Sequence, residues 1–402
     1  MTPQNSAASA TPTADSAHWL HPEACRVEDL DAIVHAPEKR ADYPRAADWL
    51  KGVPVYDPTA MDGSKDALMA EWVRVWRDGP GVLVLRGAYQ DHATIDAATA
   101  QFKLLIEEGR RAGTGADHFA KPGANDRVWN ALEKLCLRAP EVFASYYGNA
   151  MIALACEAWL GPAYQVTSQV NCVNPGGAAQ MAHRDYHLGF LTAAQAARYG
   201  AHVHQLSPLL TLQGAVAHVD MPLESGPTLY LPHSQKYAPG YLVAGRPEFQ
   251  AYFDTHHVQL PLKKGDGIFF NPALMHAAGH NRSVNIYRMA NLLQVSSAFG
   301  RAMESVDRVG MSLALYPALR AMQAGAAAGQ GGAVNSQVQC AVAACAEGYA
   351  FPTNLDRDPP IGGLAPESQQ DLMLRALGAQ WPIEKFSAAL HAHAANRSTS
   401  AP

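Results

Sequence analysis

Hydrophobic and polar residues follow a helical period in the first part of the chain. Apolar residues at helical spacing predict an amphipathic helix over residues 66–77, namely Leu68, Trp72, Val75 and Trp76. The helix is expected to stop at the Gly-Pro-Gly breaker that precedes a buried strand over 82–86. Further helices are predicted over 90–110, 126–137 and 140–160.

From Tyr164 onward the pattern changes to short apolar segments separated by turn residues. Strands are predicted over 165–173, 210–219, 228–231, 257–262, 267–270 and 284–295. Short strands at this spacing favour a β-sandwich or barrel over a parallel sheet with crossover helices. A helical pattern returns after residue 300. The sequence therefore predicts a mainly β fold with flanking N-terminal and C-terminal helices.

Three parts are expected along the chain. Residues 1–16 consist mostly of Ala, Ser, Thr and Pro and predict a flexible tail. Residues 17–300 form one domain that includes the N-terminal helices and the strands. Residues 301–402 are a helical extension packed on the same domain. This extension is compatible with a cap on the barrel or with a contact in a homo-oligomer.

Composition places the chain among globular enzymes or binding proteins. Of its 402 residues, 48% are hydrophobic and 17% are charged, which suits a sizeable core. The net charge of -5, without a run of Lys and Arg, argues against a nucleic-acid partner. No signal peptide and no membrane-spanning stretch is recognisable, so we expect a cytoplasmic protein without a membrane partner. The six cysteines form no CxxC pair and are expected to be free thiols.

The candidate chemistry begins with a His-x-Asp pair. In an extended segment, His183 and Asp185 project to the same side because side chains alternate with period two. His276 follows a turn and an apolar strand and can supply a third ligand from a neighbouring strand. Two histidines and one carboxylate form the facial triad of non-haem iron(II) oxygenases. We therefore predict His183, Asp185 and His276 as the metal ligands and catalytic centre.

A second His-x-Asp pair competes with the first. His218 follows an apolar stretch that predicts the middle of a buried strand, and Asp220 begins the next turn. A core histidine with a hydrogen-bond partner is the favoured interpretation of His218. The ligand role is therefore assigned to His183.

An arginine twelve residues after His276 gives the triad more weight. Arg288 lies within the predicted strand 284–295, where it can point into the same barrel mouth. A cosubstrate with a distal carboxylate needs a permanently charged partner, and arginine offers bidentate geometry. Arg282 is the competitor, but its surroundings predict an exposed turn.

The order of these motifs resembles the phytanoyl-CoA dioxygenase family of Fe(II)/2-oxoglutarate oxygenases. The matching pieces are His183 to His187, Glu224 to Lys236, Gly265 to His276, and Arg288. The resemblance implies a double-stranded β-helix, a cupin-like jelly roll, with helical additions at both ends. It also implies Fe(II) on the triad, O2 as oxidant and 2-oxoglutarate with its C5 carboxylate on Arg288.

The resemblance places further residues near the site. Gln180 and Gln213 are expected beside the cosubstrate, although a structural hydrogen-bond role is equally open for both. Tyr186 and His187 are expected near the metal as substrate contacts, with a surface role as the alternative for His187. The implied reaction hydroxylates, or otherwise oxidises, a C–H bond of a small-molecule substrate and releases succinate and CO2. The carboxylate of Asp185 favours hydroxylation over halogenation.

Two other functions remain open at this point. One is a non-oxygenase, metal-dependent enzyme on a cupin-like barrel, which would keep the triad but would not need Arg288. The other is a non-catalytic jelly-roll binding module with a coincidental triad. The regular order of triad, turn and arginine favours the oxygenase.

Overall fold

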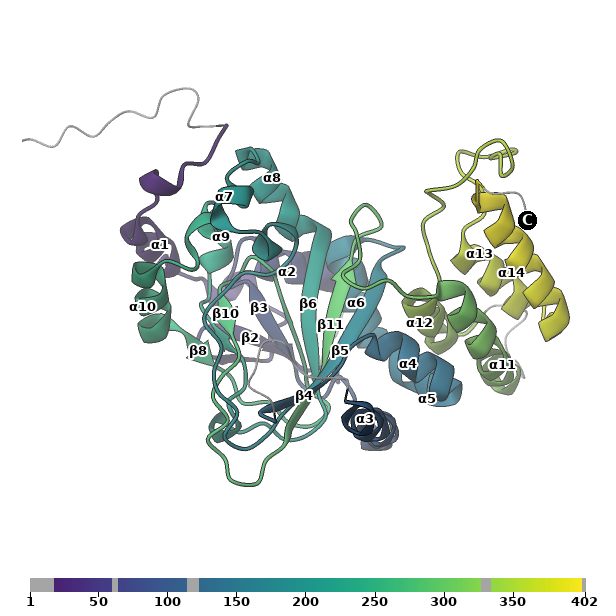
Figure 1. The fold of residues 1–402 in the computed structure, drawn as a ribbon, viewed down its shortest axis with the longest axis horizontal. Helices are drawn as coiled ribbons and strands as arrows, with labels where there is room; N and C mark the ends of the chain where they lie inside the picture. The colour runs from purple at the N-terminus through teal and green to yellow at the C-terminus, as the bar shows by residue number, and fades with distance from the viewer. Residues whose placement is uncertain (1–17, 60–63, 114–122, 327–333, 400–402) are drawn as a thin grey trace, which may run out of the picture.

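The protein is built around a large mixed β-sheet, with helices on its outer face and a smaller sheet opposite its inner face (Figure 1). The computed structural model describes residues 18–59, 64–113, 123–326 and 334–399. The predicted tail over residues 1–16 lies outside these ranges. The boundaries of the two following parts remain a prediction.

Helices account for most of the regular structure. The α-helices are α1 Val27–Val34, α2 Lys65–Arg77, α3 His92–Ala112, α4 Ala131–Arg138, α5 Pro140–Tyr147, α6 Ala150–Leu160, α7 Ala193–Ala196, α8 Ala201–Leu206, α9 Gly240–Val243, α10 Pro247–His256, α11 Arg308–Ala326, α12 Ser336–Cys345, α13 Gln369–Gly378 and α14 Ile383–Arg397. Short 3-10 helices are η2 Pro22–Ala24, η3 Arg40–Asp42, η4 His187–Phe190, η5 Ser207–Leu210, η6 Leu223–Ser225 and η7 Ser234–Lys236.

The strands are shorter and fall into two sheets. They are β1 Asp48–Leu50, β2 Val53–Tyr56, β3 Val82–Leu85, β4 Asn125–Val128, β5 Gln165–Val173, β6 Thr211–Ala217, β7 Leu229–Tyr230, β8 Val258–Gln259, β9 Gly267–Phe270, β10 His276–Ala277 and β11 Arg288–Ser296. The large sheet has the order β1-β2-β3-β9-β6-β11-β5-β4, and the small sheet has the order β10-β7-β8.

From β5 onward the chain passes back and forth between the two sheets. β5, β6, β9 and β11 pair antiparallel in the large sheet, while β7, β8 and β10 form the small one. An isolated bridge between His183 and His276 extends the small sheet by one position. Backbone pairing therefore holds His183 directly beside His276, the third residue of the predicted triad.

The prediction of a mainly β chain is not confirmed, because helices hold far more residues than strands. The strands of the small sheet are only two residues long, and four helices follow residue 300. The predicted helix over 126–137 begins later, because residues Asn125–Val128 pair with β5 as an edge strand. Pairing with a long neighbouring strand here overrides local helix propensity.

Side chains on the large sheet alternate between a helix-facing core and an inner cavity. On β9, Phe269 packs into the core beneath the helices, whereas Ile268 and Phe270 face the small sheet. The indole of Trp76 on α2 donates to the carbonyl oxygen of Phe269 at 3.2 Å. This period-two pattern leaves one face of the sheet for a site.

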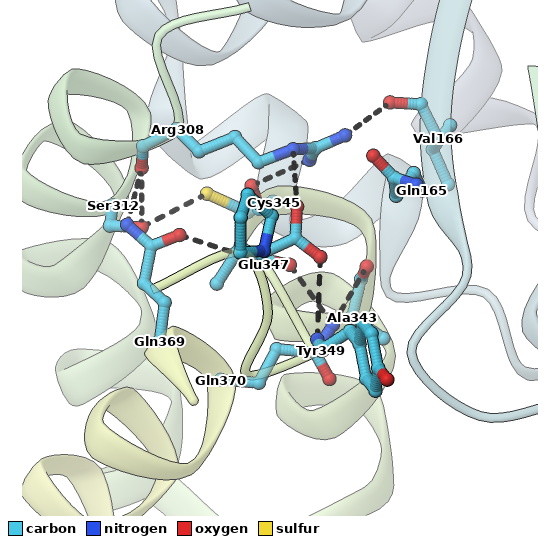
Figure 2. Close-up of polar contacts among 12 residues, drawn as sticks. Gln165, Val166, Arg308, Ser312, Ala343, Cys345, Glu347, Tyr349, Gln369 and Gln370 are labelled. Atoms are coloured by element: carbon cyan, nitrogen blue, oxygen red, sulfur yellow. Dashed lines mark hydrogen bonds and ion pairs between the residues drawn. The ribbon is translucent and has the colours of Figure 1, made fainter. Parts of the chain in front are cut away.

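The C-terminal helices join the same core and are tied to β5 by a half-buried arginine (Figure 2). Arg308, the first residue of α11, donates from Nη1 to the Cys345 carbonyl at 2.9 Å. Its Nη2 donates to the Val166 carbonyl at 3.1 Å, and its Nε lies 4.0 Å from a carboxylate oxygen of Glu347. These contacts connect α11, the end of α12 and the beginning of β5. None of the helices in the described part of the chain has the length and apolar character that a membrane crossing needs.

Candidate metal centre

Backbone pairing brings the three predicted ligands together. The amide of His183 donates to the His276 carbonyl at 2.9 Å, and the amide of His276 donates back at 3.1 Å. Asp185 lies two residues further along, so its side chain returns to the same face. The Asp185 carboxylate lies 3.7 Å from His183 Nε2 and 3.4 Å from His276 Nε2. One ligand atom from each residue lies within 4.8 Å of the others.

Both imidazoles are held in the tautomer that a metal requires. The Nδ1 atom of His183 lies 2.9 Å from the Met181 carbonyl, and that of His276 lies 2.8 Å from the Leu274 carbonyl. A carbonyl oxygen only accepts hydrogen bonds, so each Nδ1 carries the proton and each Nε2 keeps its lone pair. Burial and the neighbouring His276 lower the pKa of His183, which favours the neutral form. The donor set therefore fits a divalent transition metal.

The carboxylate of Asp185 is positioned by a neighbour on β6. Gln213 donates from Nε2 to Asp185 Oδ2 at 2.6 Å. Burial alone would raise the pKa of Asp185, but the opposing influence of His276, His183 and Gln213 outweighs it, and the net shift is downward. The carboxylate is consequently ionised, as a metal ligand must be.

The triad opens into a cavity of about 610 Å³ between the two sheets. Its wall on the large sheet is apolar toward β9 and β6, where Ala215 and Ile268 lie, and polar toward β5. Phe270 packs edge-on against His276, with ring centroids 4.8 Å apart. A cavity of this size is typical of small-molecule sites.

Arg288 also lines this cavity. It is 7% exposed, and its Nη1 donates weakly to the Gly279 carbonyl at 3.5 Å. No carboxylate in the described part of the chain lies within ion-pair distance of it. Burial lowers the pKa of Arg288 to about 10, so it remains a cation at neutral pH. A buried cation without an anion is costly, and a ligand carboxylate would offset that cost. The competitor Arg282 is exposed.

The remaining predicted residues divide into two groups. Gln180 lines the cavity, and Gln213 lines it while also holding Asp185. Tyr186 and His187 are not among the lining residues. Their φ angles of 65° and 42° turn the chain out of its extended course directly after Asp185. The Tyr186 hydroxyl points to the sulfur of Met303, and His187 Nδ1 lies 3.4 Å from the Ser207 hydroxyl. Their substrate contact remains a prediction.

The competing His218 lies in the core beneath the helices. Its Nδ1 lies 2.7 Å from the Thr99 hydroxyl and its Nε2 2.9 Å from the Tyr146 hydroxyl. Burial lowers its pKa to about 3, so the ring is neutral. Asp220 instead accepts a hydrogen bond from the backbone amide of Lys264 at 2.9 Å.

Sequence reasoning missed a row of polar residues on the cavity wall. Gln169 and Asn171 on β5 line the cavity, with Arg127 on β4 and Gln294 on β11 beside them. Arg127 Nη1 donates to Gln169 Oε1 at 2.8 Å. The sequence did carry a signal for this wall, because Gln169 and Asn171 are polar residues two positions apart within an otherwise buried strand.

The family model described as Phytanoyl-CoA dioxygenase (PhyH) matches residues 64–290. No curated protein matches the chain.

The solved structures to which the chain shows some similarity include two enzymes of nogalamycin biosynthesis. The non-heme alpha ketoglutarate dependent epimerase SnoN is 19% identical with a TM-score of 0.40, over 58% of this chain and 81% of SnoN. The alpha ketoglutarate dependent carbocyclase SnoK is 19% identical with a TM-score of 0.42, over 59% of this chain and 87% of SnoK. EvdMO1 is 18% identical with a TM-score of 0.40, over 57% of this chain and 50% of EvdMO1.

Proposed function

Because the chain belongs to the phytanoyl-CoA dioxygenase (PhyH) family, we propose that it oxidises a C–H bond of a small-molecule substrate, most simply by hydroxylation. Enzymes of this family use Fe(II), 2-oxoglutarate and O2. The observation that carries the proposal is the meeting of a His-His-Asp triad and a buried arginine in one cavity.

His183, Asp185 and His276 would hold the iron. Three facts support this assignment: both Nε2 atoms face the carboxylate, both Nδ1 protons are engaged by carbonyls, and the carboxylate is ionised. Three protein ligands on one side leave the opposite coordination positions available. Iron held by these three residues would, with 2-oxoglutarate and O2, supply the oxidant for the C–H bond, with succinate and CO2 as the coproducts.

Arg288 would bind the distal carboxylate of 2-oxoglutarate. It begins the strand that pairs with β5 and β6, so its guanidinium is held in the cavity by the centre of the large sheet. Its burial without a carboxylate partner in the described residues favours a ligand carboxylate. A charged pair formed in a site shielded from water also orients the cosubstrate for the reaction.

The connectivity of the strands supports a double-stranded β-helix. Successive segments from β5 to β11 alternate between the large and the small sheet, apart from β7 and β8, which follow one another in the small sheet. In this arrangement His183 and His276 lie on a bridge beside the small sheet, and Arg288 lies on the large sheet. The site would then lie between the two sheets of the barrel.

An anaerobic absorption experiment tests the proposal. Adding Fe(II) and then 2-oxoglutarate to the full chain should produce a weak visible charge-transfer band, which is absent with Fe(II) alone. A folded protein that binds Fe(II) but shows no band would favour the metal-dependent, non-oxygenase alternative. A folded protein that binds neither would favour the non-catalytic binding module. The matched control is Asp185→Ala, which should lose the band while Arg282→Gln keeps it.

A further inference from the structure

A second group of metal-ligating side chains lies on the surface between α1 and α10. Asp31 and His35 lie one helical turn apart on and just after α1, and His256 is the last residue of α10. One ligand atom from each residue lies within 4.8 Å of the others. Figure 1 shows the two helices side by side, on the opposite side of the molecule from α14. We propose that Asp31, His35 and His256 form a second metal site, suited to Zn²⁺ or a similar transition ion.

The separations suit a four-coordinate ion. His35 Nδ1 lies 3.0 Å from Asp31 Oδ1 and 3.2 Å from the Asp31 carbonyl oxygen, so without a metal it carries a proton that a bound ion would displace. Metal–ligand bonds of about 2.0–2.1 Å at tetrahedral angles separate neighbouring ligand atoms by about 3.3 Å. All three ligand atoms already lie within 4.8 Å of one another, so we expect movement of the exposed His35 and His256 side chains to bring them to one ion. Two imidazoles and one carboxylate select Zn²⁺ and its neighbours over Mg²⁺ or Ca²⁺, which prefer oxygen ligands.

Tyr252 on α10 organises the cluster from behind. Its hydroxyl donates to Asp31 Oδ1 at 2.8 Å, which fixes the carboxylate across the helix interface. Its ring stacks on His256 with centroids 4.1 Å apart. Its carbonyl lies 2.9 Å from His256 Nδ1, so this nitrogen carries the proton and Nε2 keeps the lone pair. The same outer arrangement of carbonyl and imidazole occurs at the candidate iron site.

The site would link α1 to α10, the helix that supports the proposed iron centre. Leu30 of α1 packs with Phe249 and Phe253 of α10 in one apolar cluster. From the same helix, Gln250 bonds both the amide and the carbonyl of Ala182, the residue before His183. An ion between α1 and α10 would strengthen the helix pair that holds this segment.

Metal counting in variants tests the proposal independently of the oxygenase function. The full chain, free of any histidine tag, is dialysed against micromolar Zn²⁺ and its zinc is measured by mass spectrometry. To remove the candidate iron site from the count, the experiment uses the His183→Ala/His276→Ala variant as background. This background should retain one equivalent of zinc and gain thermal stability on zinc addition. Adding His256→Ala or His35→Ala to this background should abolish both the bound zinc and the increase in thermal stability.

Two further variants sharpen the result. His391→Ala is the matched control, because His391 is also exposed on a helix with Nδ1 near a carbonyl, at 2.9 Å. It should keep the equivalent. Tyr252→Phe should weaken zinc binding several-fold without abolishing it. The proposal is wrong if the background variant takes up no zinc, or if adding His256→Ala lowers its zinc content no more than adding His391→Ala does.

Discussion

Gln213 and Asp185 are joined by a short hydrogen bond, with 2.6 Å between the amide nitrogen Nε2 and the carboxylate oxygen Oδ2. The same Nε2 lies 3.3 Å from Gln294 Oε1 on the neighbouring strand β11. Asp185 follows an isolated bridge, and residues with positive φ come directly after it. Its side chain therefore depends on the large sheet for its orientation.

Replacing Gln213 by Leu should weaken Fe(II) binding. Loss of a partner that orients a metal ligand typically lowers metal affinity by about 10–100-fold. Gln213→Glu should weaken it at least as much, because a second carboxylate would face Asp185. Anaerobic Fe(II) titrations in the presence of 2-oxoglutarate measure the effect. Gln180→Leu is the control, since Gln180 lines the cavity without bonding Asp185. Equal affinities in all three variants would contradict the positioning role of Gln213.

Arg288→Gln should selectively lower the affinity for 2-oxoglutarate. A hydrogen bond to a charged group contributes about 1.5–3 kcal/mol, so the dissociation constant should rise by about 10–100-fold. The dissociation constant of Arg288→Lys should lie between those of the wild type and Arg288→Gln, because lysine keeps the charge but loses the bidentate geometry. Titration of the Fe(II) protein with 2-oxoglutarate measures each constant. Arg282→Gln, on the exposed turn, should bind normally, and normal binding by Arg288→Gln would exclude Arg288 as the carboxylate partner.

The sequence was sufficient to bring the triad together because its positions follow the geometry of strands. His183 and Asp185 share a face through period two, and His276 begins the strand that bridges back to His183. Arg288 could be separated from Arg282 because one lies in a β-branched and apolar strand and the other in a polar turn. These inferences depend on local patterns that the fold preserves.

Features set by tertiary contacts escaped prediction. The turn at Tyr186 and His187 uses left-handed backbone angles, which residues other than glycine adopt only when their surroundings enforce them. β4 forms because the edge of β5 that faces away from β11 pairs with residues 125–128. The cluster of Asp31 with His256 joins residues far apart in sequence, and nothing local in α1 indicates that α10 lies beside it.

His218→Gln should change how stability depends on pH. The native pKa of His218 is about 3, below the usual unfolded value of about 6.5. The unfolded chain therefore takes up a proton between these values while the native protein does not, so the contribution of His218 to stability is present above pH 6.5 and is lost as pH falls. Near neutral pH the variant should be less stable by about 1–3 kcal/mol, because buried partners lose their hydrogen bonds.

Wild type and His218→Gln differ in their free energy of unfolding, and this difference should narrow by up to about 1.4 kcal/mol per pH unit below pH 6. Urea unfolding of the metal-free proteins at pH 7.5, 6, 5 and 4.5 measures it. Titration of other histidines cancels in this difference. The exposed His391→Gln serves as the control and should follow the wild type throughout. A difference that stays constant with pH would mean that His218 has the same pKa in the native protein as in the unfolded chain.

Gly240→Ala should disturb the metal centre from outside the cavity. The side chain of Arg184, which lies between the two proposed metal ligands His183 and Asp185 in sequence, crosses directly over Gly240, where an added Cβ would overlap the guanidinium. The guanidinium donates to the Ser234 carbonyl and lies 5.3 Å from the centre of the Tyr241 ring. Overpacking of this kind costs about 1–3 kcal/mol. The displaced arginine should also shift the His183–Asp185 segment, so Gly240→Ala should lower both thermal stability and Fe(II) affinity. Gly245→Ala, at a position with no atoms within 4 Å of the added Cβ, should change neither. If Gly240→Ala loses stability but binds Fe(II) normally, Arg184 supports the fold without positioning the ligands.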